Sequence, residues 1–170
     1  MDLSKVVRDV YDFPKEGIVF KDITPILQDP DSLTEAVNQI QDKIKDLDFD
    51  YVIGPESRGF IFGVPVSYNL KKGFIPVRKK GKLPFETKEK EYDLEYGTAT
   101  IEMHIDAIRP GQKVVIVDDL LATGGTSKAM VELIEEMGGE IVGFVYLIEL
   151  EFLNGRKLLE GYNVHSIIKY

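Results

Sequence analysis

The apolar pattern of the chain predicts an α/β fold in which helices flank a central, mainly parallel sheet. Segments with strand character alternate along the chain with segments whose apolar residues recur at helical spacing. Two predicted strands, residues 113–119 and 140–150, have long apolar runs, which are typical of parallel strands buried on both faces. The 170 residues are 44% hydrophobic and 29% charged, so we expect a single domain over residues 1–170.

The first half of the chain contains two apolar strand segments and three segments with helical character. We expect strands at residues 51–54 and 73–77, and helices at residues 3–10, 30–47 and 57–70. Ser32 and Glu35 have the spacing of a capping box at the start of the second helix. Pro65 lies inside the third predicted helix, where it removes a backbone hydrogen bond and is expected to make the helix irregular.

The second half of the chain continues the alternation. We expect strands at residues 98–108, 113–119, 140–150 and 164–170, and a helix at residues 126–137. Gly138 and Gly139 mark the end of that helix, and the last strand is expected at an edge of the sheet. Residues 84–98 are polar and charge-rich, so they are predicted to form a flexible surface loop.

The composition excludes several kinds of protein. The chain has no cysteine, which excludes disulfides and thiolate metal ligands. Its net charge of −8 is unfavourable for general nucleic-acid binding, which requires a basic face. The N-terminal residues lack a signal-peptide pattern, and no apolar run approaches the roughly 20 residues of a membrane helix. We therefore expect a cytoplasmic protein with neither nucleic-acid nor membrane partners.

Residues 114–130 combine a buried strand, two acids, a small-residue loop and the start of a helix. Gly124 and Gly125 let the loop backbone approach a ligand closely, and N–H groups at a helix N-terminus bind anions. The loop therefore predicts a phosphate site. Asp118 and Asp119 would repel phosphate, but they suit ribose hydroxyl groups or positive charge on a reacting sugar. Both acids can face one ligand only if the strand ends there.

Other interpretations of these motifs remain open. The stretch can be a core strand followed by a turn with an aspartate helix cap. It can also be an ATPase strand whose acid holds magnesium, although the chain lacks the G-x-x-x-x-G-K-[ST] loop that would accompany it. The basic run at residues 77–82 is either a solvated patch at a strand end or a set of cations that faces a diphosphate.

Five blocks of sequence, in this order, resemble the type I phosphoribosyltransferases and, among them, the adenine phosphoribosyltransferases. The blocks are FPKEGIVFKDITPIL (13–27), GPESRGFIFG (54–63), RKKGKLP (78–84), LEYG (94–97) and VVIVDDLLATGGT (114–126). The resemblance extends from about Val6 to Leu159. It implies the type I phosphoribosyltransferase fold with a small hood. It also implies transfer of ribose 5-phosphate from 5-phosphoribosyl 1-pyrophosphate (PRPP) to adenine, giving AMP and pyrophosphate, with Mg²⁺ as cofactor and a homodimer as the assembly.

The resemblance also implies a role for each block. The 5′-phosphate would be held by Ala122, Thr123, Gly124, Gly125 and Thr126, the pyrophosphate by Ser57, Arg58, Arg78 and Lys82, and adenine by Val19, Lys21 and Leu153. Lys21 stands where members of the family often have arginine. The ribose hydroxyls would be held by Asp118 and Asp119, and Mg²⁺ mainly through the substrate. A cis peptide bond is implied near Glu56–Ser57.

The polar segment 84–98 would act as a lid that closes over the site and excludes water. Glu95 and Tyr96 would lie on this lid, with Glu95 handling the proton on the imidazole ring of adenine. Two other functions use the same fold. Another purine base can be the acceptor, although the ESRGF (56–60) and LEYG blocks disfavour this. A regulatory module can bind PRPP without catalysis, but such modules usually carry a DNA-binding domain, and the first 12 residues are too few for one.

Overall fold

The computed structural model describes residues 1–94 and 96–170. The chain divides into two compact units, Met1–Gln39 and Ile40–Tyr170. The prediction of one domain over residues 1–170 stays a prediction.

The first unit contains a β-hairpin followed by helices. A 3-10 turn, η1 (Leu3–Lys5), leads into strand β1 (Arg8–Tyr11), which pairs antiparallel with β2 (Val19–Asp22). The helix predicted at residues 3–10 is therefore wrong beyond residue 5. Its second half pairs instead with a segment eight or more residues away, and ion pairs add to this pairing: Arg8–Asp22 at 2.7 Å and Lys21–Asp9 at 2.6 Å.

Helix α1 (Thr24–Gln28) precedes α2 (Pro30–Asp42), which continues into the second unit. The carboxylate of Asp29 accepts a hydrogen bond from the backbone N–H of Ser32 at 2.8 Å. Glu35 accepts one from the N-terminal ammonium of Met1 at 3.0 Å. The predicted capping box of Ser32 and Glu35 is wrong, because Asp29 caps the helix and the carboxylate of Glu35 binds the chain terminus. The helix also ends five residues before the predicted end.

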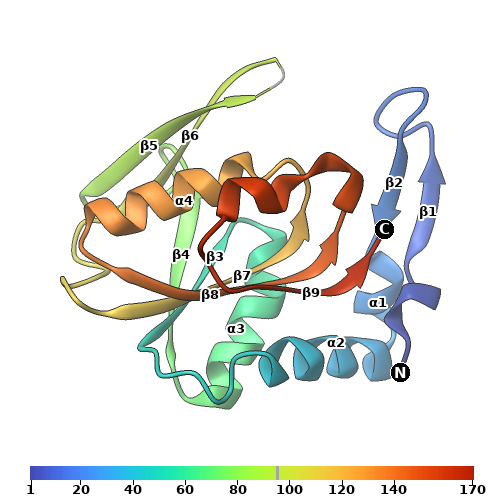
Figure 1. Cartoon of the computed structure of the whole chain (residues 1–170), viewed down its shortest axis with the longest axis horizontal. Coiled ribbons are helices and arrows are strands. Elements are labelled where there is room, and N and C mark those ends of the chain that lie inside the picture. Colours follow the sequence, from blue (N-terminus) through green and yellow to red (C-terminus); the bar gives the residue numbers. More distant parts are fainter. Residues whose placement is uncertain (95) are drawn as a thin grey trace. The chain divides into compact units, whose positions relative to one another are not determined.

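The second unit is built on a seven-stranded sheet with the order β5-β6-β4-β3-β7-β8-β9 (Figure 1). The strands are β3 (Tyr51–Pro55), β4 (Gly73–Lys79), β5 (Thr87–Leu94), β6 (Gly97–His104), β7 (Lys113–Leu121), β8 (Glu140–Glu149) and β9 (Val164–Lys169). Strands β4, β3, β7, β8 and β9 run parallel, whereas β5 and β6 continue the sheet antiparallel. The mainly parallel sheet and the edge position of the last strand are confirmed.

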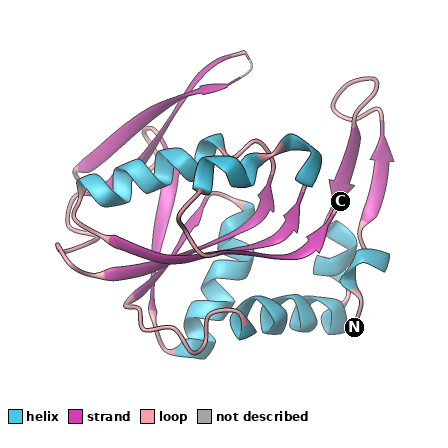
Figure 2. Cartoon of the chain, viewed as in Figure 1, coloured by secondary structure: helices cyan, strands magenta, loops and turns pink. Residues whose placement is uncertain are grey.

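Helices cover both faces of the parallel strands (Figure 2). Helix α3 (Arg58–Leu70) lies on one face, and α4 (Gly125–Glu136) lies on the other with the 3-10 segments η2 (Glu151–Leu153) and η3 (Gly155–Leu159). The apolar residues in the middle of β7 and β8, among them Ile116 and Phe144, are fully buried. This confirms the interpretation of the two apolar runs, and it leaves the polar residues at the carboxyl ends of the strands to form a site.

Residues 84–98, predicted as a loop, are largely a β-hairpin. Strand β5 pairs with β6 from the Thr87–His104 pair to the Leu94–Gly97 pair. Lys90 on this hairpin forms ion pairs with Glu132 and Glu136 of α4 at 3.0 and 2.9 Å. The prediction of a loop is wrong, because backbone pairing and ion pairs support the strand where apolar burial does not.

Candidate active site

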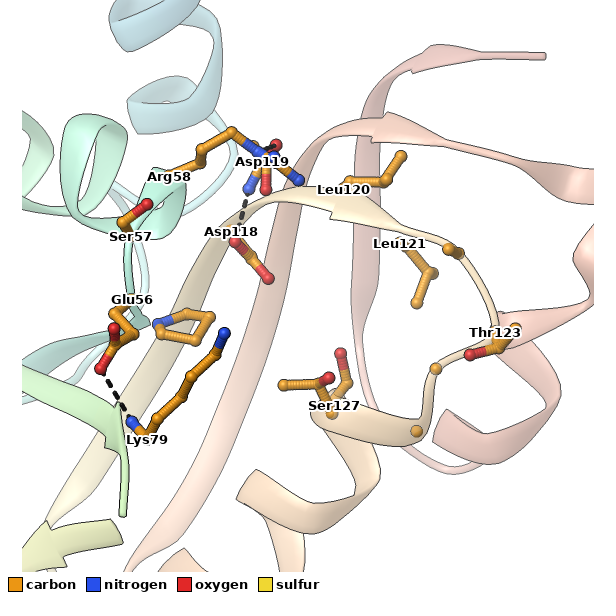
Figure 3. Close-up of a pocket in the computed structure, with 15 residues that line it drawn as sticks. Glu56, Ser57, Arg58, Lys79, Asp118, Asp119, Leu120, Leu121, Thr123 and Ser127 are labelled. Carbon is orange, nitrogen blue, oxygen red and sulfur yellow. Dashed lines mark hydrogen bonds and ion pairs between the residues drawn. The ribbon is translucent and has the colours of Figure 1, made fainter. Parts of the chain in front are cut away.

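A cleft of about 420 Å³ lies at the carboxyl ends of β3 and β7 (Figure 3). Three segments line it: residues 55–58 from the end of β3 into α3, Lys79 at the end of β4, and residues 118–127 from the end of β7 into α4. Ligands of parallel α/β sheets bind at this end of the strands. The cleft therefore gathers in one place the loop and the acids predicted to bind a sugar phosphate.

Residues 122–126, the predicted phosphate loop, all line the cleft. Gly124 has a φ of 85°, a left-handed conformation that favours glycine. Helix α4 begins at the next residue, and its first N–H groups have no acceptor within the helix. Together with the helix dipole, they make this loop suited to a phosphate.

The two acids lie within β7, because the strand continues to Leu121 and does not end at residue 119 as we expected. Both nevertheless line the cleft. Asp119 is 6% exposed, and its Oδ2 accepts a hydrogen bond from Nε of Arg58 at 2.5 Å. The Oδ1 of Asp118 accepts one from the backbone N–H of Asp119 at 2.8 Å. Figure 3 shows the carboxylates projecting from the strand in different directions.

Burial raises the pKa of Asp118 well above its usual range, and the negative charge of the adjacent Asp119 raises it further. Arg58 opposes the shift only partly. A buried carboxylate next to another carboxylate is a frequent feature of functional sites. A ligand that supplies positive charge or hydroxyl donors here would favour the ionised form of Asp118.

The turn after β3 brings Ser57 and Arg58 to the cleft, and the Glu56–Ser57 peptide bond is cis, as the resemblance implies. Glu56 links this turn to β4, because its Oε1 accepts hydrogen bonds from the backbone N–H of Lys79 at 2.8 Å and from Nε of Arg78 at 3.2 Å. Lys79 lines the cleft. We did not predict Lys79 as a site residue, although it belongs to the same basic run.

Arg78 and Lys82, the other cations predicted for pyrophosphate, are not among the residues that line this cleft. Arg78 contacts Glu56, and Nη1 of Arg78 lies 3.4 Å from the carbonyl oxygen of Lys82. The backbone N–H of Lys82 donates to the buried carboxylate of Glu102 at 3.1 Å. Their roles toward pyrophosphate stay predictions.

The β5–β6 hairpin contacts the phosphate loop at the start of α4. The hydroxyl of Tyr92 lies 3.1 Å from Oγ1 of Thr126, and Tyr92 and Tyr96 line a second pocket together with Thr123. Tyr96 is 82% exposed. Glu95, the predicted proton-transfer residue, lies outside the described residues. Sequence reasoning missed Tyr92, for which the only signal was its position in the segment predicted as a lid.

The predicted adenine residues belong to different units. Val19 and Lys21 lie on β2 of the first unit, whereas Leu153 ends η2 in the second. Val19 and Leu153 are partly exposed, and Nζ of Lys21 lies 2.6 Å from Oδ1 of Asp9. An adenine site made by these residues stays a prediction.

Comparison with known proteins agrees with this geometry. The sequence profile of the phosphoribosyl transferase domain matches residues 22–166. The chain belongs to the phosphoribosyltransferase family. It is 64% identical over 168 residues to the adenine phosphoribosyltransferase of Lachnoclostridium phytofermentans, with 99% of this chain and 97% of the relative covered. It is 60% identical over 171 residues to that of Acetivibrio thermocellus, with both chains fully covered.

Solved structures of the family share the fold. The crystal structure of adenine phosphoribosyltransferase from Thermoanaerobacter pseudethanolicus has a TM-score of 0.95 and 50% identity, and the match covers 99% of this chain and 98% of that one. The enzyme from Saccharomyces cerevisiae, complexed with D-2,5-dideoxy-2,5-imino-altritol 1,6-bisphosphate and adenine, has a TM-score of 0.91 and 37% identity, with 97% and 96% covered. The cleft at the end of β7 therefore belongs to a member of the phosphoribosyltransferase family.

Two further features of the described residues concern metal ligands and membrane-spanning helices. Among residues 1–94 and 96–170, no group of three or more His, Asp or Glu side chains is arranged to hold a metal ion. The two acids of the cleft still suit Mg²⁺, which typically binds one or two carboxylates together with substrate phosphates. In the same part of the chain, none of the helices has the length and apolar character needed to span a membrane.

Proposed function

We propose that the chain transfers the 5-phosphoribosyl group of PRPP to adenine, releasing AMP and pyrophosphate, in the cytoplasm. One observation carries this proposal: a single cleft contains an anion-binding loop at residues 122–126, two acids, and the cations Arg58 and Lys79. The loop follows β7, whereas the cations follow β3 and end β4, which suits the 5′-phosphate and the 1-diphosphate at the two ends of PRPP. The names of close relatives, at 55–64% identity over nearly the whole chain, support adenine as the base.

Each part of the cleft has a task in this reaction. The loop N–H groups and Thr126 bind the 5′-phosphate and so fix the sugar in the cleft. Asp118 and Asp119 accept hydrogen bonds from the ribose hydroxyls. Their negative charge also stabilises the positive charge that develops on the sugar as the bond to pyrophosphate breaks.

The leaving pyrophosphate carries several negative charges. Ser57, Arg58 and Lys79 surround its proposed position, and fixed cations stabilise its departure. Mg²⁺, held through the diphosphate and one or both acids of the cleft, would supply further positive charge to the leaving group. Arg58 pairs with Asp119 through Nε alone, at 2.5 Å, and a guanidinium has five N–H donors, so the carboxylate and pyrophosphate share the charge of Arg58.

Incubation of the purified chain with adenine, PRPP and Mg²⁺ tests the proposal, with AMP as the measured product. Hypoxanthine, guanine and xanthine serve as competing acceptors. Formation of AMP with adenine alone is the expected result. Tight binding of PRPP without any product would support the regulatory module instead.

The role of Glu95 as the proton-transfer residue is part of this proposal. Removal of a general acid or base typically lowers the rate about 10²–10⁴-fold, so Glu95→Gln should reduce kcat within that range. Glu91→Gln is the matched control, because Glu91 is an exposed acid on the same hairpin. Full turnover by Glu95→Gln would remove Glu95 from the mechanism.

We also propose a homodimer, as the family resemblance implies. Ile61, Val64 and Tyr68 lie at helical spacing on α3 and are 37%, 46% and 82% exposed, so they share one side of the helix, which a second subunit would cover. Sedimentation of the wild type should give a dimer, and Tyr68→Asp should shift it toward the monomer. A monomeric wild type would contradict the proposal.

A further inference from the structure

We propose that Gly155 is a positioning residue for the loop at residues 122–126, and that an ion pair of the next residue, Arg156, holds it there. The identity of the ligand, a sugar 5-phosphate, rests on the proposed function. Gly155 is not among the residues that line the cleft, so it acts on the ligand through the loop.

The backbone of Gly155 lies directly against the backbone of the loop. A Cβ atom on Gly155 would come within 2.3 Å of the carbonyl oxygen of Ala122 and 3.0 Å of the amide nitrogen of Gly124. A Cβ atom on Gly124 would come within 2.6 Å of the carbonyl oxygen of Gly155. The obstructing atoms are backbone on both sides, so no change of rotamer relieves the overlap. The loop keeps its shape only while both positions are glycine.

Arg156 fixes Gly155 to the sheet. Its Nε and Nη2 donate hydrogen bonds to the carboxylate of Glu149 at 2.9 and 2.5 Å, and its Nη1 donates to the carbonyl oxygen of Val164 at 2.7 Å. The hydroxyl of Ser166 donates to the same carboxylate at 2.5 Å. Glu149 is only 3% exposed, and bidentate guanidinium–carboxylate pairs have a defined geometry. The segment that carries Gly155 is therefore held in one position.

Glu149 supports the other side of the loop as well. It is the register partner of Leu121, the residue that leads into the loop. The backbone N–H of Leu150 donates to the carbonyl oxygen of Leu121 at 3.0 Å. The end of β8 thus holds both the strand that enters the loop and, through Arg156, the glycine that backs it.

Binding of two ligands separates this role from a general structural one. Gly155→Ala must displace backbone to open the 2.3 Å approach, and displacements on the order of 1 Å reduce function up to about 10²-fold. We expect the Kd for ribose 5-phosphate, measured by calorimetry on the full chain, to rise about tenfold or more. The Kd for pyrophosphate, proposed to bind the turn at residues 57–58, should stay unchanged. In turnover, KM for PRPP should rise more than kcat falls.

Gly143→Ala is the matched control, because the nearest atom to its new Cβ would be the flexible tip of Leu47 at 3.4 Å. It should bind both ligands like the wild type. Arg156→Lys keeps the charge but loses the bidentate geometry, and it should weaken ribose 5-phosphate binding several-fold. If Gly155→Ala does not fold, the same two Kd measurements on Arg156→Lys test the inference.

Several results would overturn the inference. These are wild-type affinity for ribose 5-phosphate in both variants, an equal loss of pyrophosphate binding, or a wild type that does not bind ribose 5-phosphate. A wild type that binds ribose 5-phosphate but forms no AMP would overturn the proposed function and leave the positioning role intact.

Discussion

The ion pair between Arg58 and Asp119 allows a quantitative test of the electrostatics of the cleft. Replacing Arg58 with methionine keeps most of the side-chain length but removes the cation that lies 2.5 Å from Asp119. The carboxylate of Asp119 is nearly buried and sits next to Asp118, so it loses its compensating charge. The variant should therefore be less stable than the wild type.

The magnitude follows from the exposure of the two partners. Hydrogen bonds to charged groups contribute about 1.5–3 kcal/mol when they are buried, and fully exposed ion pairs contribute about 0–1 kcal/mol. The side chain of Arg58 is 48% exposed and that of Asp119 is 9% exposed. We expect a coupling free energy of about 1 kcal/mol, between these limits, which corresponds to a change in Tm of about 2–4 °C for a chain of this size.

A double-mutant cycle in urea measures this coupling from Arg58→Met, Asp119→Asn and the combined variant. The pair of Lys113 and Asp48 is the matched control. Its contact is 3.1 Å and Asp48 is 91% exposed, so solvent screens the pair and its coupling should be weaker than that of Arg58 and Asp119. A coupling for Arg58 and Asp119 that does not exceed the control would refute the reasoning.

The same pair predicts an effect on ligand binding. Because the negative charge of Asp119 repels pyrophosphate and competes with it for Arg58, Asp119→Asn should bind pyrophosphate several-fold more tightly than the wild type, about fivefold for each 1 kcal/mol gained. Calorimetry with pyrophosphate alone checks this, since pyrophosphate has no ribose to contact residue 119. Weaker binding by the variant would show that Asp119 itself helps to hold the ligand.

Three further predictions concern the surroundings of the cleft. Asp118 has a raised pKa in the folded state, so its contribution to the free energy of unfolding falls as pH rises above about 4. In urea unfolding, Asp118→Asn should be more stable than the wild type at pH 7 but not at pH 4. An equal stability difference between variant and wild type at both pH values would contradict this. Tyr146→Phe should lower the free energy of unfolding by about 1–3 kcal/mol, because it removes the hydrogen-bond partner of the buried Ser127 hydroxyl, 2.6 Å away. Adding Ser127→Ala should recover part of this loss in the same urea experiment. No recovery would exclude the hydrogen bond as the cause. Lys90→Ala should leave the global free energy of unfolding almost unchanged, because its ion pairs are exposed to solvent, yet it should speed amide exchange in β5. Unchanged exchange would show that the ion pairs do not hold the hairpin.

The parallel part of the fold was predictable because its signal is local. The apolar runs of β7 and β8 and the small-residue loop after β7 each occupy consecutive positions in the sequence. The hairpins were not predictable in this way. Strand β1 depends on pairing with Val19–Asp22, and β5 depends on β6 and on acids of α4. Local propensity does not report such distant partners.

In the candidate site, too, the residues with a local signal were predicted and those that depend on distant contacts were not. The acids and the phosphate loop were predicted because they are contiguous with a strand. Lys79 was missed because alternation along β4 decides which cation of the basic run faces the cleft, and the last residue of the strand was not known. Gly155 gave no signal either. Its importance appears only where its backbone meets residues 122–124, about 30 positions earlier in the chain.

The attachment of the β5–β6 hairpin to the sheet has a mechanical consequence. Among the described residues, two register pairs join β6 to β4, Arg78 with Glu102 and Lys79 with Ile101, and one further backbone bond runs from Lys80 to Thr100 at 3.0 Å. This short pairing is supplemented by the ion pairs of Lys90 with Glu132 and Glu136 of α4 and by the burial of Met103 of β6 in the core. One of the two register pairs between β4 and β6 contains Lys79, which lines the cleft. The backbone that joins the hairpin to the parallel strands is therefore the same backbone that positions a cation beside the proposed site of the leaving group, so a change in this pairing would also displace Lys79.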